Sequence, residues 1–442
     1  MADWRKPRLY NHSHTGSDMS FAESPTLATD KRIRARIAAG ESVLHLAFGE
    51  AGLPVIPEAA QGLVDGAHLN GYGPVAGSDE ARAAVAGYWN RRQLPTQPDS
   101  VILAPGSKAI LYALLRVISG DVILPQPSWV SYGAQALIAG HEVVWVPTPP
   151  EAGGIPDPVL LDAAILSVQA RGRRVGCLIV TLPDNPTGTL ASRELVEAVC
   201  QVADRHGVAV ISDEIYRDLA YQPEAFHSPA HCLPARTVVT TGLSKSVALG
   251  GWRIGVARFP ESAWGEKVRD DVVALASELW SSLAAPMQRV ATRIFSEPAQ
   301  VVDHIASSRR LHRSVAIAAR QLFLDAGAQC HLPQGAFYLY PDFAPIRAQL
   351  ERLGAASSAA LAEYLLSQRG VAVLAGTAFG DEASALRFRA ATSLLYGQTD
   401  EQRWESLRSP APCELPWIKE SLSRLAEALV PLRSLSATPH PV

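Results

Sequence analysis

The stretch TVVTTGLSKSVALGGWRIG, residues 237–255, joins two apolar, strand-like runs through a segment of small residues that carries one lysine. Lys245 follows the first run, and Arg253 opens the second run eight residues later. Lysine is normally a solvated surface residue. An amine among small and apolar residues is poorly hydrated, which lowers its pKa and makes it a better nucleophile and base. We therefore expect Lys245 to be a functional residue.

Other strand-like runs precede this stretch, and helical patterns separate most of them. The runs cover residues 100–105, 121–127, 141–147, 176–183, 207–214, 237–244 and 252–260. Continuous apolar strands alternating with helices are typical of a mainly parallel sheet covered on both faces. The sequence thus predicts an α/β fold whose large domain has a mainly parallel, seven-stranded sheet sandwiched by helices.

The remaining segments predict a second, smaller α/β domain. A helix is expected over residues 30–40, and a long helix over about 300–328 connects the two domains. We divide the chain into a polar N-terminal arm, loose or draped over a partner (1–30), the first part of the small domain (31–60), the large domain (61–300) and the C-terminal small domain (301–442). The irregular stretch at about 396–416 predicts a surface insertion, as a lid or a dimer contact.

Composition excludes several classes of partner. The chain has 442 residues, a formal net charge of -3 and scattered basic residues, so neither nucleic acid nor an anionic membrane surface is expected as a partner. The N-terminus has no apolar signal-peptide core, and no run of about 18 apolar residues predicts a membrane span. Five cysteines without CxxC spacing indicate reduced thiols and a cytoplasmic location.

Polar residues follow four of the predicted strands, where ligands of such sheets collect. Gly106, Ser107 and Lys108 open a helix whose free N–H groups form an anion site, typically for phosphate. The other three strand ends carry Asn185, then Asp213 with Tyr216, and then Lys245. A Schiff-base lysine, a phosphate cradle, an aspartate for a pyridinium nitrogen and donors for a phenolate are what pyridoxal phosphate requires. Arg253 would close on the phosphate.

These ordered motifs resemble the class I/II, fold-type-I pyridoxal phosphate aminotransferases, from about Ala22 to the C-terminus. The resemblance implies that Lys245 carries the cofactor as a Schiff base and acts as general acid and base, with Ser244 beside it. It implies that Arg253 binds the phosphate, that Asn185 and Tyr216 contact the phenolate side, and that Asp213 holds the ring nitrogen.

The resemblance assigns four further positions. Trp129 in PSWVSY stacks on the cofactor ring, and Tyr72 in GYGPVAG reaches the phosphate of the neighbouring subunit, which implies a homodimer. Gly49 in FGEAGLP lies against the substrate. Arg387 in LRFRAATS clamps the substrate α-carboxylate. An L-amino acid and a 2-oxo acid are the implied substrates, exchanging an amino group through pyridoxamine phosphate.

The chain departs from the family pattern at two of these places. Gly242 stands three residues before the lysine, where the family usually has a Ser or Thr phosphate ligand, so Thr241, Ser244 or water would replace it. Arg389 stands where the family often has Ser, and either touches the substrate or pairs with a surface acid. Lys108 meets either an acidic substrate side chain or solvent.

Alternatives remain beside the aminotransferase interpretation. A lyase, a replacement enzyme or an oxidase acting on an amino acid uses the same scaffold, since a fold does not fix a reaction. A ligand-sensing regulator would need a DNA-binding module that residues 1–30 are too short to form. The segment HSPAHC, residues 227–232, contains possible metal ligands but lacks a fourth one, so no metal site is predicted.

Overall fold

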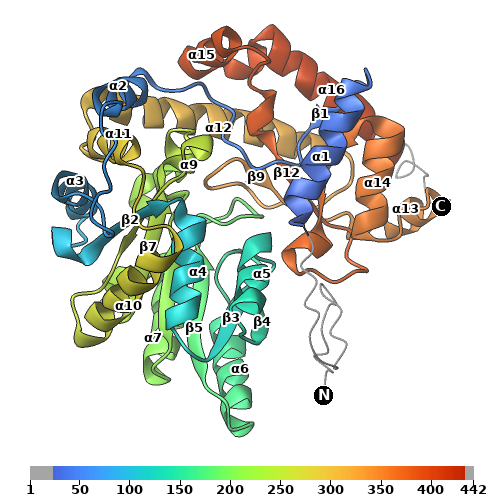
Figure 1. The fold of residues 1–442 in the computed structure, drawn as a ribbon. Coiled ribbons are helices and arrows are strands. Elements are labelled where there is room, and N and C mark those ends of the chain that lie inside the picture. The colour runs from blue at the N-terminus through green and yellow to red at the C-terminus, as the bar shows by residue number, and fades with distance from the viewer. Residues whose placement is uncertain (1–22, 434–442) are drawn as a thin grey trace.

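The computed structural model describes residues 23–433, and its centre is a seven-stranded sheet with the order β2-β8-β7-β6-β5-β3-β4 (Figure 1). The strands are β2 (Val101–Pro105), β3 (Asp121–Gln126), β4 (Val143–Pro147), β5 (Val175–Thr181), β6 (Ala209–Asp213), β7 (Thr237–Gly242) and β8 (Ile254–Arg258). β8 runs antiparallel to both of its neighbours, and the other pairs are parallel. Each predicted strand of the large domain is therefore present.

Alternate residues of these strands enter two different cores, which is why the runs are apolar throughout. Ile102 and Val122 pack with helices α4, α5 and α10, whereas Ile123 and Val210 pack with α6 and α7 on the opposite face. The helices of this part of the chain are α2 (Pro57–Gly66), α3 (Asp79–Asn90), α4 (Ser107–Val117), α5 (Val130–Ile138), α6 (Pro158–Ala170), α7 (Arg193–Arg205), α8 (Pro229–Cys232), α9 (Leu243–Ser246), α10 (Ala263–Leu279) and α11 (Ala285–Phe295).

A second unit has its own core, and the long helix α12 (Ala299–Asp325) joins it to the first (Figure 1). Val301 of α12 lies in a core of the large sheet, and Leu311 lies in the core of the second unit. The other elements are α1 (Pro25–Ala38), β1 (Leu44–His45), β9 (Tyr338–Leu339), α13 (Arg347–Arg352), α14 (Ser358–Arg369), β10 (Val371–Ala372), β11 (Leu374–Ala375), β12 (Phe388–Ala391), α15 (Asp400–Arg408) and α16 (Pro416–Arg433). β1 pairs with β10, and β12 lies between β11 and β9.

The N-terminal segment differs from its prediction in where its helix begins. α1 starts at Pro25, because proline is preorganised for the first helical turn, and Gly40 at φ 85° follows its end. Asp30, predicted near the helix start, instead lies inside the helix and pairs with Arg34 at 2.7 Å. Residues 23–30 are thus not an extended arm, and residues 1–22 of the predicted arm lie outside the described residues.

The stretch at 396–416 is more regular than predicted. It contains α15, and Tyr396 and Leu407 are buried in the core of the second unit. The Tyr396 hydroxyl lies 2.6 Å from Nδ1 of His312 on α12, so this stretch is fixed to the long helix. The stretch is therefore partly helical and anchored in the core rather than irregular, although most of its residues remain at the surface. Between residues 23 and 433, no helix combines the length and apolarity needed to cross a membrane.

Candidate active site

A hollow of about 590 Å³ lies at the carboxyl ends of the central strands, between the sheet and the second unit. Ten of the predicted residues line it: Gly49, Ser107, Lys108, Trp129, Asn185, Asp213, Tyr216, Ser244, Lys245 and Arg253. Its wall also includes Tyr132 and Tyr338, which were not predicted, and Arg389, for which substrate contact was one of two expectations. Gly106 lies against Arg253, directly behind the lining. Tyr72 and Arg387 are not part of this wall.

Lys245 projects from the short helix α9, which directly follows β7. Its Nζ donates a hydrogen bond of 2.5 Å to the carbonyl of Gly49, which lies in the FGEAGLP segment that was also predicted to reach the site. Burial, followed by the nearby positive charge of Arg389, lowers the pKa of Lys245 to about 8. The uncharged fraction of the amine, which would act as the nucleophile, is therefore about a tenth at pH 7, far larger than for an ordinary lysine.

The start of α4 and Arg253 form an anion cradle. Gly106 caps this helix at φ 89°, and a Cβ there would lie 2.2 Å from Nη2 of Arg253. Gly255 approaches equally closely, since its Cβ would lie 2.2 Å from the Ser107 nitrogen. Arg253 adopts φ 55°, and its Nη1 donates to the Gly250 carbonyl at 2.9 Å, which fixes the guanidinium beside the helix N-terminus. Free N–H groups and an adjacent guanidinium suit a phosphate.

Gly242, the first departure from the family pattern, has a steric cause. Gly242 pairs with Gly255 across β7 and β8, and a Cβ at position 242 would lie 2.5 Å from the Ile254 carbonyl oxygen. No side chain fits there without moving the backbone. The Thr241 hydroxyl donates to the Glu214 carbonyl at 3.2 Å, whereas Ser244 lines the pocket. Of the two candidate hydroxyl residues, Ser244 is the one that lines the pocket.

Asp213 ends β6 as a buried carboxylate. Its Oδ2 accepts a 2.7 Å hydrogen bond from the Tyr132 hydroxyl, which also lies 2.7 Å from Oγ1 of Thr181. Burial raises the pKa of Asp213 to about 6, against the opposing effect of the Tyr132 hydrogen bond, so the carboxylate is mostly ionised at neutral pH. Sequence reasoning missed Tyr132, although it lies in the first turn of α5, three residues after Trp129, which caps this helix.

Hydroxyl and aromatic groups form much of the remaining wall. The Tyr216 hydroxyl lies 2.7 Å from that of Tyr338, whose ring packs edge-on against Tyr216. Trp129 packs edge-on against Tyr132 at 5.1 Å between ring centroids, and Nζ of Lys108 lies 5.1 Å from the Trp129 ring. Burial, followed by the charge of Arg253, lowers the pKa of Lys108. Lys108 therefore borders the pocket while its side chain is still exposed to solvent.

The two arginines around β12 occupy opposite environments. Arg387 precedes the strand and forms ion pairs with Asp342 at 2.8 Å and Asp381 at 3.0 Å, with 38% of its side chain exposed. The structure thus does not bring Arg387 to the pocket, where the sequence analysis had placed it as the carboxylate clamp. Two carboxylates outside the pocket already satisfy its charge.

Arg389, in contrast, is 1% exposed and lines the pocket. Its Nη1 donates to Oδ1 of Asn185 at 3.1 Å and its Nη2 to the Ala47 carbonyl at 2.6 Å. Its Nε has no hydrogen-bond partner, and no carboxylate of residues 23–433 forms an ion pair with it. A surface ion pair, one of the two expectations for this residue, is therefore excluded within the described chain.

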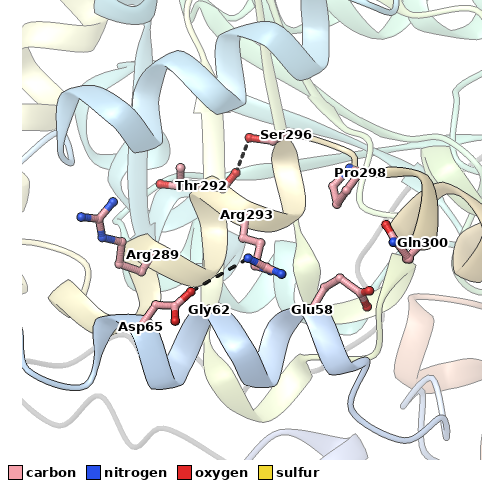
Figure 2. Close-up of a pocket in the computed structure, with 9 residues that line it drawn as sticks. All are labelled: Glu58, Gly62, Asp65, Arg289, Thr292, Arg293, Ser296, Pro298 and Gln300. Atoms are coloured by element: carbon pink, nitrogen blue, oxygen red, sulfur yellow. Dashed lines mark hydrogen bonds and ion pairs between the residues drawn. The ribbon is translucent and has the colours of Figure 1, made fainter.

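Tyr72 lies apart from the pocket in this single chain. It is 97% exposed and borders a different depression, together with Trp280 and Pro286. A further hollow of about 610 Å³ lies between α2 and α11, with Glu58, Asp65, Arg289 and Arg293 on its walls (Figure 2). Asp65 and Arg293 approach to 3.9 Å across it, and none of the predicted site residues lines it.

The donor set of the pocket fits pyridoxal phosphate. The glycine-built cradle between α4 and Arg253 has the space and charge for the phosphate, because a Cβ at Gly106 would fill it. Lys245 lines the same pocket and would provide the amine for the Schiff base, and the buried carboxylate of Asp213 would hold the ring nitrogen. Asn185 and Tyr216 also line the pocket and are the residues that would contact the phenolate oxygen.

Comparisons with known proteins agree with this geometry. The family model for aminotransferases of class I and II matches residues 41–394. An aspartate/prephenate aminotransferase of Thermus thermophilus is 34% identical over 70% of this chain and 76% of its own length. An aspartate aminotransferase of Bacillus sp. strain YM-2 is 30% identical over 85% of this chain and 94% of its own.

A solved structure of Thermus thermophilus aspartate aminotransferase with maleate has a TM-score of 0.78 at 28% identity. It covers 92% of this chain and 97% of its own. Its fold is therefore shared across both units of this chain. The chain belongs to the class I and II aminotransferases, pyridoxal phosphate-dependent enzymes of fold type I.

Proposed function

We propose that this enzyme transfers an amino group from an L-α-amino acid to a 2-oxo acid, and that Arg389 binds the α-carboxylate of both. The observation that carries this proposal is a buried guanidinium that lines the pocket without any carboxylate partner in residues 23–433. A buried, unpaired charge is costly, and a carboxylate ligand offsets that cost with charge-assisted hydrogen bonds. Two donor groups of Arg389 are already fixed by Asn185 and Ala47, which orients the guanidinium plane.

The roles of the other residues follow from their positions. Bound pyridoxal phosphate supplies an electron sink for the carbanion formed at the substrate Cα. Lys245, with its pKa near 8, accepts the Cα proton at Nζ and returns it to the cofactor side. Asp213 is the buried carboxylate that would keep the ring nitrogen protonated, and Tyr132 orients this carboxylate through its hydrogen bond. The Gly49 carbonyl accepts a hydrogen bond from Nζ of Lys245, and Trp129 would stack against the cofactor ring.

We further propose a homodimer in which Tyr72 serves the pocket of the partner subunit. Support comes from the 97% exposure of a large aromatic side chain and from its distance from the chain's own pocket lining. Mixed dimers test this arrangement. Lys245→Ala and Tyr72→Ala chains, each impaired alone, should regain activity on mixing, because one pocket of the hybrid then contains native Lys245 and native Tyr72. No gain above the sum of the two would contradict it.

The pocket charge does not select one class of substrate side chain, because the wall carries both Lys108 and Glu50. The maleate complex and the names of the relatives make aspartate one donor to test. Arginine tests a donor with a positively charged side chain, and leucine tests a donor with an uncharged one. We also propose a reducing, cytoplasmic setting, supported by five cysteines that are all free thiols.

The experiment that tests the function follows the cofactor absorbance while single amino acids are added without a 2-oxo acid. Transamination predicts stable conversion to the pyridoxamine form, which a 2-oxo acid reverses. An amine that lacks the α-carboxylate is the matched control and should convert far more slowly. Recovery of the starting spectrum without an oxo acid, with release of ammonia, peroxide or carbon dioxide, would instead show a lyase, an oxidase or a decarboxylase.

A further inference from the structure

Three possible metal ligands converge on the outer side of α7, away from the cofactor pocket. They are Glu197 on α7, His227 before α8, and Cys232 at the end of α8. One ligand atom of each residue lies within 4.8 Å of the other two. The closest pair is Nε2 of His227 and Sγ of Cys232, at 3.1 Å. The sequence shows His227 and Cys232 as neighbours, but only the fold adds the carboxylate from thirty residues earlier.

The chemistry of this set is selective. A thiolate, an imidazole and a carboxylate are ligands of zinc, whereas magnesium and calcium prefer oxygen ligands alone. Three protein ligands leave one tetrahedral position for water, and all three side chains are half-buried, so water and an entering ion can reach them. Nε of Arg193 donates to Oε1 of Glu197 at 2.7 Å, which leaves Oε2 as the free carboxylate oxygen.

The segments that carry the ligands are held by bonds independent of any ion. The Ser228 hydroxyl accepts from the Ala230 nitrogen at 3.2 Å and donates to the Glu214 carboxylate, next to Asp213 in the chain. Sγ of Cys200, one turn after Glu197 on α7, donates to the Pro229 carbonyl at 3.8 Å. These contacts fix α8 against α7 and position the ligands before an ion binds. Preorganisation of this kind favours binding.

We propose that Glu197, His227 and Cys232 bind one zinc-class divalent ion, with water as the fourth ligand. The ion would cross-link α8 and the segment before it to α7. Because none of the three residues lines the cofactor pocket, the site is structural and the reaction does not pass through it. The ion would stabilise α7 and α8, which pack against β6, the strand that ends at Asp213.

The experiment uses the untagged, cofactor-loaded enzyme with Zn²⁺ as the probe. Equilibrium dialysis should give one tightly held Zn²⁺ per chain. Zinc K-edge X-ray absorption should then show one sulfur ligand at about 2.3 Å beside nitrogen and oxygen ligands at about 2.0–2.2 Å. Cys232→Ser should remove the sulfur signal. Glu197→Gln, which keeps the size of the side chain but removes its charge, should weaken zinc binding on the order of 10-fold or more.

Cys413→Ser is the matched control, since Cys413 is a similarly half-buried thiol that donates to the Ser314 carbonyl elsewhere in the fold. It should leave both the stoichiometry and the sulfur signal unchanged. Cofactor absorbance verifies that each variant is folded, and His227→Gln replaces Cys232→Ser if the latter fails this check. Absence of stoichiometric zinc, a zinc without a sulfur ligand, or a sulfur signal that survives Cys232→Ser would each overturn the proposal.

Discussion

The pocket has two halves, and they differ in how each holds its charges. In the cofactor half, at the edge of the seven-stranded sheet, Asp213 is the last residue of β6 and Lys245 lies just after β7. In the substrate half, Arg387 and Arg389 are two positions apart around the short strand β12, and only the second reaches the pocket. Strand position therefore places a residue at the sheet edge, but the location of counter-charges decides which arginine is available to a ligand.

The acids that separate the two arginines come from distant segments. Asp342 and Asp381 bind Arg387, and Asp381 also accepts a 2.8 Å hydrogen bond from the Tyr340 hydroxyl. Arg389 lies between the aromatic rings of Tyr338 and Phe379, with its guanidinium carbon 4.9 and 5.1 Å from their centroids. One arginine is thus neutralised at the surface, and the other is enclosed by aromatic rings and carbonyl oxygens.

Removing the nucleophile of the cofactor half should have the largest effect. Lys245→Ala eliminates both the covalent attachment and the proton transfer, and general acid–base catalysis alone contributes about 10²–10⁴-fold. We expect turnover to fall by at least that factor, while the cofactor still binds noncovalently. Activity assays and the absorbance of the bound cofactor measure the two effects. Turnover within 10-fold of the native value would exclude Lys245 as the catalytic amine.

Removing the guanidinium of the substrate half should come next. Arg389→Gln removes two charge-assisted hydrogen bonds to the α-carboxylate, at about 1.5 kcal/mol each, so kcat/KM should fall about 150-fold. For an amine without a carboxylate, the native enzyme and the variant should be similar. An equal loss with both substrates would show that Arg389 acts on the fold or the cofactor instead of the carboxylate.

An effect of intermediate size is expected from pH, because protonation of Lys245 controls how fast the chain takes up pyridoxal phosphate. The pKa of the free chain's lysine is lowered to about 8, so below pH 8 most of the amine is protonated and unreactive. The rate of reconstitution with pyridoxal phosphate should therefore rise about 10-fold per pH unit from pH 6.5 and level off above pH 8. A rate that still rises through pH 10 would indicate an unshifted lysine.

The smallest effect is expected for the outer arginine. Arg387→Gln breaks partly exposed ion pairs, which contribute about 0–1 kcal/mol to stability. The equilibrium constant of unfolding and kcat/KM should therefore each change by less than about fivefold. Urea unfolding and steady-state kinetics check both quantities. A loss in kcat/KM as large as that of Arg389→Gln would restore Arg387 as the carboxylate clamp and remove the proposed distinction.

The cofactor half could be predicted because its information is local. Asp213, Asn185 and Lys245 each follow an apolar run, and the parallel order of the sheet brings the ends of such runs together. Gly106 could likewise be predicted, since a glycine that opens a helix after a strand is a common anion site.

The substrate half depends on contacts that no local pattern contains. Arg387 and Arg389 face the same way by the period of a strand, and only Asp342 and Asp381 separate them. Tyr338 could not be identified as part of the pocket, because GAFYLYP contains several aromatic residues and only the fold sets which one meets Tyr216. The helix inside 396–416 was missed because its mixed, polar sequence hides the few residues that face α12.

One measurement tests the assignment of the substrate carboxylate most directly: spectral titration of the native, Arg389→Gln and Arg387→Gln enzymes with the α-methyl analogue of the best donor. The analogue binds but has no α-proton to lose, so the titration isolates affinity from turnover. We predict that Arg389→Gln weakens binding about 100-fold, in line with the loss of a bidentate carboxylate contact, and that Arg387→Gln changes it less than about threefold. The reverse order, or equal losses, would contradict the assignment.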